Sequence, residues 1–227
     1  MVSAGAGDSV RAWVVYPERR ERAPVVLVVH EIFGLSNWVR GVADQLAADG
    51  FIAIAPDLLT GKAPLGPGDS LAHDVARTTI RALDTAEVHR RLDAVARYGM
   101  ALPAAMPRYG IVGYCWGGSA SFAHAVHSAT LGAAVVYYGG SPPVAHLTKV
   151  RAPVLGLYAS DDARVNATVP PTDSAMRALG KPFEIHTFEG AGHGFLRAQG
   201  GANPANDAAA RGAWPLTIGF FRRHLGG

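Results

Sequence analysis

A short motif around the only cysteine constrains the fold of this chain more than any other feature. Residues 113–117 read Gly-Tyr-Cys-Trp-Gly, between a short apolar run at residues 109–112 and a helix-like run at residues 119–127. This Gly-x-Cys-x-Gly form is the nucleophile-elbow pattern with cysteine in place of serine. A nucleophile on a sharp strand-to-helix turn has a strained backbone, so its close neighbours must lack a Cβ atom. The motif predicts an exposed thiol at a helix N-terminus, where the helix dipole favours the thiolate. The alternative is a buried cysteine that acts as a small core residue.

The composition fits one domain with a large core. The chain has 227 residues, 49% of them hydrophobic, and a mean hydropathy of +0.13. That is enough for a well-packed domain. No linker, charge block or internal repeat divides the chain. We therefore expect residues 1–9 to be a flexible N-terminus and residues 10–227 to form a single domain without a separate cap domain.

Charge and hydropathy argue against several classes of partner. The net charge is only +3 and the basic residues are scattered, which disfavours nucleic acid, while a pI near 9.2 is compatible with anionic small substrates. The apolar runs have the length of strands and none could span a bilayer. A single cysteine fits a reducing compartment, and residues 1–8 lack the basic start and apolar core of a signal peptide. We expect a cytoplasmic protein, monomeric or weakly dimeric, with no membrane partner.

Strands alternate with helices along the sequence. Near-continuous apolar runs are typical of strands buried on both faces of a parallel sheet, and amphipathic segments between them predict helices. The pattern predicts an α/β fold with a mostly parallel central sheet and helices on both faces. The predicted strands are residues 10–16, 24–29, 51–55, 109–112, 133–138, 153–158 and 183–188. The predicted helices are residues 36–49, 71–98 with a break near 83–84, 119–127, 170–179 and 206–225, the last kinked at Pro215. Residues 62–68, rich in Pro and Gly, predict an ordered loop or a rim over a site.

Reactive side chains follow four of the predicted strands. Glu31, Cys115, Asp162 and His193 each come soon after such a strand. Because sites in parallel sheets form at the carboxyl ends of strands, we expect these side chains to gather at one edge.

A histidine and an aspartate complete the pattern of a nucleophilic site. His193 lies in Gly-Ala-Gly-His-Gly-Phe, a loop that can bring an imidazole over the sheet edge. Such an imidazole can accept the thiol proton or pair with the thiolate. The alternative interpretation is a loop histidine that only caps a neighbouring group. Its other nitrogen needs an acceptor, for which Asp161 and Asp162 are candidates and Asp162 is preferred. The order nucleophile, acid, histidine is that of α/β-hydrolases.

An oxyanion formed during acyl transfer requires two backbone donors. The N–H of Trp116, directly after the cysteine, is one candidate, and Ile32, in the loop after the first buried strand, is the other. Glu31 in the same loop could accept the thiol proton or pair with an arginine. His124 and His127 share a helix face but have no carboxylate or cysteine partner, a weak case for a metal. We expect neither metal nor cofactor.

With these motifs, the chain resembles the dienelactone hydrolase family of α/β-hydrolases. The matching segments are His-Glu-Ile-Phe-Gly at 30–34, Gly-Tyr-Cys-Trp-Gly-Gly at 113–118, Asp-Ala-Arg-Val at 162–165 and Ala-Gly-His-Gly-Phe-Leu-Arg at 191–197. The general layout is similar from about residue 10 to residue 224. The resemblance implies an α/β-hydrolase fold and a triad of Cys115, Asp162 and His193, and its Asp-x-x-Val match selects Asp162 over Asp161.

The resemblance also implies roles for charged residues. Glu31 would leave the thiol protonated at rest until substrate displaces its carboxylate, a switch against oxidation or idle hydrolysis. Arg197 would bind a substrate carboxylate, together with Arg77 or Arg81 from the segment after the Pro/Gly loop. Phe33, beside Glu31, is a further candidate substrate contact.

We therefore expect a cysteine-dependent hydrolase of small esters or lactones, of the carboxymethylenebutenolidase type, that acts through a thioester acyl-enzyme. The serine that follows the catalytic histidine in the family is Gly194 here, so one polar contact with substrate is lost. A promiscuous short-chain carboxylesterase and a catalytically silent homologue that binds a small ligand are the alternatives.

Overall fold

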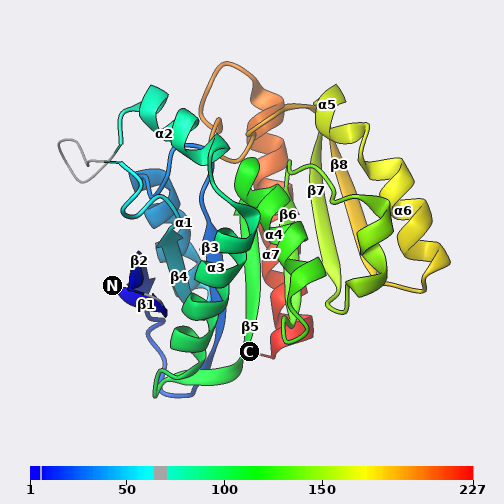
Figure 1. Ribbon diagram of the computed structural model, residues 1–227. Coiled ribbons are helices and arrows are strands. Elements are labelled where there is room, and N and C mark those ends of the chain that lie inside the picture. The colour runs from blue at the N-terminus through cyan, green and yellow to red at the C-terminus, as the bar shows by residue number, and fades with distance from the viewer. Residues whose placement is uncertain (6, 64–70, 227) are drawn as a thin grey trace. The chain divides into compact units, whose positions relative to one another are not determined.

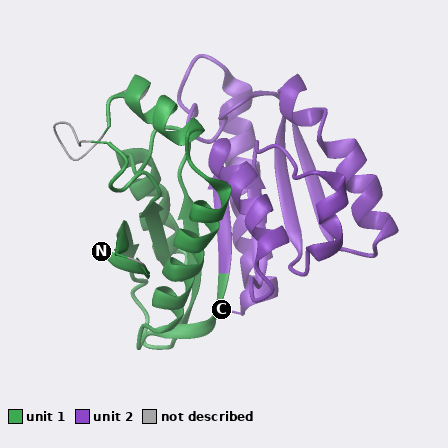
Figure 2. Ribbon diagram, in the orientation of Figure 1, with its two compact units in different colours: residues 1–109, 227 green, residues 110–226 purple. Residues whose placement is uncertain are grey.

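The apolar runs predicted as strands are strands in the structure, a computed structural model that describes residues 1–5, 7–63 and 71–226 (Figure 1). The chain divides into two units, Met1–Tyr109 and Gly110–Gly226 (Figure 2). The boundary falls within one strand, β5 (Ala105–Tyr114). Residues 64–68 of the predicted Pro/Gly-rich loop lie outside the described residues.

The first unit contains strands in the order β1-β2-β4-β3. Their bounds are β1 Val2–Gly5, β2 Asp8–Val15, β3 Ala23–Val29 and β4 Ile52–Asp57. The pair β3 and β4 is parallel, whereas β2 pairs antiparallel with both β1 and β4. Every residue of β3 and β4 is buried, which explains their near-continuous apolar sequences.

Three helices complete the first unit: α1 (Asn37–Ala48), α2 (His73–Arg81) and α3 (Thr85–Met100). Both α1 and α3 pack on the strands of the unit, and in Figure 1 α3 lies in front of these strands while α1 lies behind them. The predicted helix break near residue 83 is confirmed, since Asp84 caps α3 by accepting a hydrogen bond from the N–H of Ala86.

The prediction of a flexible N-terminus was wrong for residues 2–5. These residues form β1, in which Val2 lies opposite Val10 of β2. An alternation of two small buried side chains, Val2 and Ala4, is too short to be recognised in a sequence. The start of β2 is also held by Arg91 of α3, which binds both carboxylate oxygens of Asp8. The hydrogen bond with Arg91 is the main cause of the lowered pKa of Asp8.

The second unit is built on parallel strands in the order β5-β6-β7-β8. The bounds not yet given are β6 Ala133–Tyr137, β7 Val154–Asp161 and β8 Phe183–Gly192. The helices are α4 Trp116–His127, α5 Ala163–Asn166, α6 Val169–Ala178, α7 Pro204–Leu225 and the 3₁₀ helix η2 Val144–Lys149. Figure 1 shows α4 in front of the strands and α7 behind them. Because the strands are parallel, their carboxyl ends meet at one edge.

Several elements are longer than predicted. The strand predicted at residues 109–112 begins at Ala105, and the strand predicted at 183–188 continues to Gly192. The short helices η2 and α5 were not predicted, because their few residues give no periodic pattern. Pro215 lies inside α7, and the kink expected there stays a prediction.

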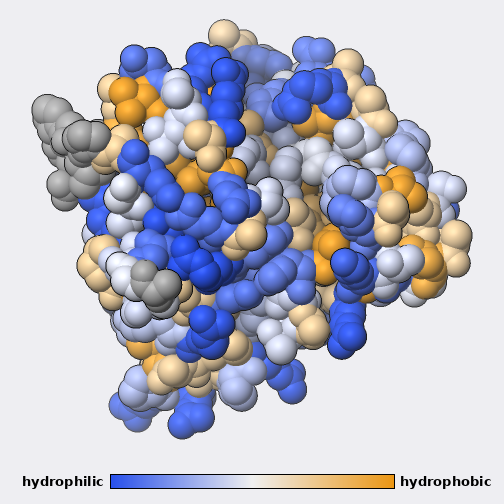
Figure 3. All heavy atoms as spheres, in the orientation of Figure 1, coloured by the Kyte–Doolittle hydropathy of each residue, from blue (hydrophilic) through white to orange (hydrophobic). Residues whose placement is uncertain are grey.

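The surface is mixed in polarity. On the face seen in Figure 3, hydrophobic residues form several separate groups among hydrophilic ones. In the described ranges of the chain, no helix combines the length and the apolar character needed to cross a membrane.

Candidate active site

Cys115, Asp162 and His193 share one position in the fold, the first residue after a strand. The strand β5 ends at Tyr114, β7 ends at Asp161 and β8 ends at Gly192. At this edge His193 Nε2 lies 3.1 Å from Cys115 Sγ, and His193 Nδ1 lies 2.5 Å from Asp162 Oδ2. The predicted thiol, imidazole and carboxylate are therefore brought together in one chain of hydrogen bonds.

The cysteine lies on a sharp turn between β5 and α4. Its φ is 56° and its ψ is −114°, in the left-handed half of backbone space that side chains rarely adopt. A Cβ atom added to Gly113 would lie 2.0 Å from the carbonyl oxygen of Gly117, and one added to Gly118 would lie 2.5 Å from that of Tyr137. The glycines thus allow α4 to approach the strands closely. The Cys115 N–H donates to the Tyr137 carbonyl at 3.1 Å, which holds the turn against β6.

The thiol is half-buried rather than enclosed in the core. Trp116 is the first residue of α4, so its N–H is among those that point out of the helix N-terminus. The positive end of the helix dipole at this position favours a thiolate or an oxyanion.

The imidazole of His193 is placed to carry a positive charge. The hydrogen bond with Cys115 is the strongest influence and, together with the weaker one from Asp162, raises the pKa of His193 to about 9 against the opposing effect of burial. Asp162 is 9% exposed, and its Oδ1 accepts a hydrogen bond from the N–H of Val165 at 3.4 Å. Asp161, the other candidate, is exposed. The geometry therefore assigns the acceptor position to Asp162.

One aromatic side chain that the sequence analysis missed lies against the histidine, and a cluster of others adjoins it. The Tyr138 ring lies 5.3 Å from the His193 ring, centroid to centroid, and Tyr138 has a φ of 38°. Phe195 is fully buried and packs its ring against those of Tyr137, Tyr138 and Phe188. A tyrosine with positive φ has no signature in a single sequence, so no signal pointed to Tyr138.

The predicted residues Glu31, Ile32 and Phe33 directly follow β3 in the first unit. Glu31 is buried, and its carbonyl oxygen accepts a hydrogen bond from His30 Nδ1 at 2.6 Å. His30 Nε2 accepts from the N–H of Leu58, which requires a neutral ring, and burial lowers the pKa of His30 accordingly. This ring fixes the backbone at Glu31, while the assigned roles of Glu31, Ile32 and Phe33 stay predictions.

The arginines predicted to bind substrate are exposed. Arg77 and Arg81 lie on α2 in the first unit, and Arg197 follows the His193 loop in the second. Their roles also stay predictions.

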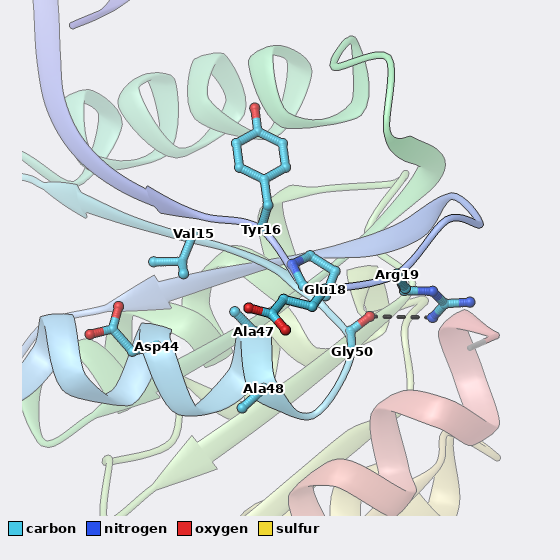
Figure 4. A pocket seen from close by; sticks show the side chains of 9 residues that line it. Val15, Tyr16, Glu18, Arg19, Asp44, Ala47, Ala48 and Gly50 are labelled. Atoms are coloured by element: carbon cyan, nitrogen blue, oxygen red, sulfur yellow. Dashed lines mark hydrogen bonds between the residues drawn. The ribbon is translucent and has the colours of Figure 1, made fainter.

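Two further features of the structure include no residue of the triad. His124 and His127 are neighbours on α4, with ring centroids 5.9 Å apart. Within residues 1–5, 7–63 and 71–226, no three or more His, Cys, Asp or Glu side chains are placed so that they could hold a metal ion together. A surface pocket of about 530 Å³ lies in the first unit between the end of β2 and α1 (Figure 4). Its walls include Tyr16, Glu18 and Asp44 but none of the predicted site residues.

Comparisons with known proteins identify the family and agree with the fold. A model of the "Dienelactone hydrolase family" matches residues 10–225. Relatives from Salmonella typhi and Escherichia coli (strain K12), each named "Putative carboxymethylenebutenolidase", are both 31% identical over 233 residues, covering 97% of this chain and 85% and 84% of theirs. A crystal structure of a "Putative Dienelactone Hydrolase" from Klebsiella pneumoniae is 29% identical, with a TM-score of 0.85, and covers 97% of this chain and 95% of that one.

The strand arrangement and the elbow define an α/β-hydrolase, as the sequence predicts. The family match spans nearly the whole chain, so the chain belongs to the dienelactone hydrolase family and is a carboxylic ester hydrolase.

Substitution Gly113→Ala should disrupt the elbow. The added methyl group would lie 2.0 Å from a backbone oxygen, so α4 must move away from β5. We expect thermal unfolding to show a loss of about 1–3 kcal/mol, typical of overpacking, together with a large loss of esterase activity. Gly140→Ala is the matched control, since its added Cβ would lie 3.7 Å from Ser119 Oγ, an ordinary contact. Equal stability of the two variants would contradict the close-approach argument.

Proposed function

We propose that the chain hydrolyses small esters and lactones through a thioester on Cys115, with His193 as the proton carrier and Asp162 as its orienting group. The observation that carries this proposal is the continuous contact from Sγ through the imidazole to the carboxylate, at 3.1 and 2.5 Å. A nucleophile, a base and a third group that holds the base are what covalent acyl transfer requires.

In the first half of the reaction, Cys115 Sγ attacks the carbonyl carbon and the carbonyl oxygen becomes an oxyanion. The N–H of Trp116 and the dipole of α4 would stabilise that charge. As the tetrahedral intermediate collapses, the C–O bond breaks and His193 Nε2 gives its proton to the leaving alkoxide. For a lactone the released alcohol stays attached to the acyl group.

In the second half, His193 accepts a proton from a water molecule, which attacks the thioester carbonyl. The C–S bond breaks, the carboxylic acid leaves, and the thiolate pairs again with the protonated imidazole. Asp162 stabilises that imidazolium throughout and keeps the Nδ1 proton in place.

The geometry favours an ion pair that exists before substrate binds. The contact between Sγ and Nε2 is already made at 3.1 Å, and the hydrogen bonds with Cys115 and Asp162 raise the pKa of His193 to about 9, which favours a protonated imidazole at neutral pH. The resemblance implies the contrary resting state, in which the buried carboxylate of Glu31 keeps the thiol protonated. The reactivity of the thiol without substrate separates these two states.

A substrate that carries a carboxylate is supported by the names of the relatives and by Arg197. Two relatives are named for a carboxymethylenebutenolide, a lactone with a carboxylate. Arg197 lies four residues after His193, and its N–H donates to the carbonyl of Gly194 in the same loop. Its exposed guanidinium is therefore the candidate in this loop for binding a substrate anion.

Substitution Cys115→Ala should lower kcat/KM for p-nitrophenyl acetate by at least about a hundredfold, because the nucleophile is lost. The wild-type enzyme quenched during turnover should carry an acetyl group on the peptide that contains Cys115, detectable by mass spectrometry. Cys115→Ser is the matched variant, since it keeps the shape of the side chain and should form an ester in place of the thioester. Wild-type turnover by Cys115→Ala would refute the proposed nucleophile.

The rate of Cys115 alkylation by iodoacetamide should depend on His193. Because the pKa of His193 is raised to about 9, the imidazolium is present between pH 6.5 and pH 8 and can stabilise a thiolate, so the wild-type rate should vary less with pH in this range than that of an ordinary thiol. In His193→Gln the rate should be at least about tenfold lower at pH 6.5 and should rise with pH, as for an ordinary thiol. A slow wild-type reaction that accelerates when a substrate analogue is added would instead support the Glu31 switch.

Substitution Arg197→Ala should raise KM for a carboxylated lactone by about five- to tenfold, the scale of one partly exposed ion pair or charge-assisted hydrogen bond. KM for a neutral lactone should stay within about twofold. The control is Arg151→Ala, because Arg151 is exposed at the amino end of β7, opposite the triad. An unchanged KM for the anionic lactone would favour a short-chain carboxylesterase without an anion preference.

A further inference from the structure

The backbone beside His193 gives the imidazole little restraint of its own. Glycines stand on both sides, and Gly194 has a φ of 78°. The His193 side chain is 34% exposed, so packing does not enclose it. Gly192 ends β8 opposite Asp161 of β7, but glycine leaves the chain around His193 free to adopt many conformations, so further contacts are needed to fix the ring.

One anchor lies on the C-terminal side of the loop. Phe195 is fully buried, and its ring contacts three aromatic rings in the second unit. This anchor fixes the chain two residues after the histidine, while the residue before it lies at the very end of β8.

The second anchor comes from α7. Gly192, directly before His193, donates its N–H to Asn206 Oδ1 at 2.9 Å. Asn206 is 8% exposed and lies in the first turn of α7, 14 positions further along the chain. A buried amide that bonds a specific backbone group has one orientation, so the hydrogen bond defines where the peptide before His193 lies.

We propose that Asn206 is a positioning residue for the reaction, which sets the alignment of His193 with Cys115 and Asp162 by holding the N–H of Gly192. The inference rests on the proposed function of the triad and extends it to a residue that touches no reacting atom. A displacement of about 1 Å in a reacting group can lower a rate by about a hundredfold.

The chain offers a matched control on the same helix. Asn203 caps α7 by accepting from the N–H of Ala205 at 3.0 Å, and its Nδ2 donates to the carbonyl of Gly190 at 2.9 Å. It therefore joins α7 to the same segment, but two residues further from His193 and at an exposed position. Removing it should lower stability by about 1 kcal/mol, as for other N-caps, without moving the imidazole.

The test compares Asn206→Ala, Asn206→Asp and Asn203→Ala in the full-length chain. Each variant is measured for thermal unfolding, for kcat and KM with p-nitrophenyl acetate, and for Cys115 alkylation at pH 6.5. We expect Asn206→Ala to lose about 10- to 100-fold in kcat with KM within about twofold, and to alkylate more slowly. Asn206→Asp should restore kcat to within about threefold, because its carboxylate accepts the same N–H. Asn203→Ala should keep the wild-type kcat and alkylation rate.

Three results would overturn the inference. One is a wild-type kcat in folded Asn206→Ala. Another is an equal loss of kcat in Asn203→Ala, which would show a general stabilising role. The third is a failure of Asn206→Asp to restore activity. If Asn206→Ala does not fold, Asn206→Leu fills the same volume without an acceptor and carries the same test. Turnover by Cys115→Ala would refute the proposed function itself, whereas an inactive Cys115→Ala with a fully active Asn206→Ala would refute the positioning role alone.

Discussion

Hydrogen bonding between parallel strands is the constraint on which the second unit and its site depend. Tyr114 of β5 lies opposite Tyr137 of β6, and Asp161 of β7 lies opposite Gly192 of β8. Cys115, Asp162 and His193 each follow one of these strands directly. A strand advances about 3.3 Å per residue, so a slip of two residues would move a strand end by about 6.6 Å. A slip of one residue would turn every side chain of that strand to the other face. Contacts of 2.5 and 3.1 Å survive neither change.

The turn at Cys115 stores strain that the surrounding packing holds in place. A non-glycine residue in a sparsely populated backbone region costs about 1–3 kcal/mol. The hydrogen bond from Cys115 N–H to Tyr137 and the close approach of α4 through Gly113 and Gly118 oppose relaxation of that turn. The same turn directs Sγ toward His193 and starts a helix behind it. Strain, exposure and the electrostatic setting of the thiol thus have one structural cause.

Features that depend on neighbouring residues could be predicted from the sequence, whereas features that depend on contacts between distant residues could not. The elbow, the Asp-x-x-Val segment and the glycine-flanked His193 are local patterns, and so the triad residues and the parallel strands were predicted from sequence. The short strand at residues 2–5 was missed, since it depends on pairing with β2 and on the contact between Arg91 and Asp8, far apart in the chain. Tyr138 and Asn206 were missed for the same reason, because nothing near them in the sequence indicates that they lie beside His193.

The proposed catalytic residues are held by restraints of different range. Cys115 is fixed mainly by a turn whose glycines and helix lie within a few residues of it, with one further hydrogen bond from its N–H to Tyr137 of β6. Asp162 is buried at the start of α5 and has its own backbone partner three residues later. His193 alone sits between glycines, and its restraints come from the end of β8, from the aromatic rings around Phe195 and from the first turn of α7. Proton transfer is therefore the step whose geometry depends most on distant packing. Changes in α7 can alter that step while the nucleophile and its helix keep their arrangement.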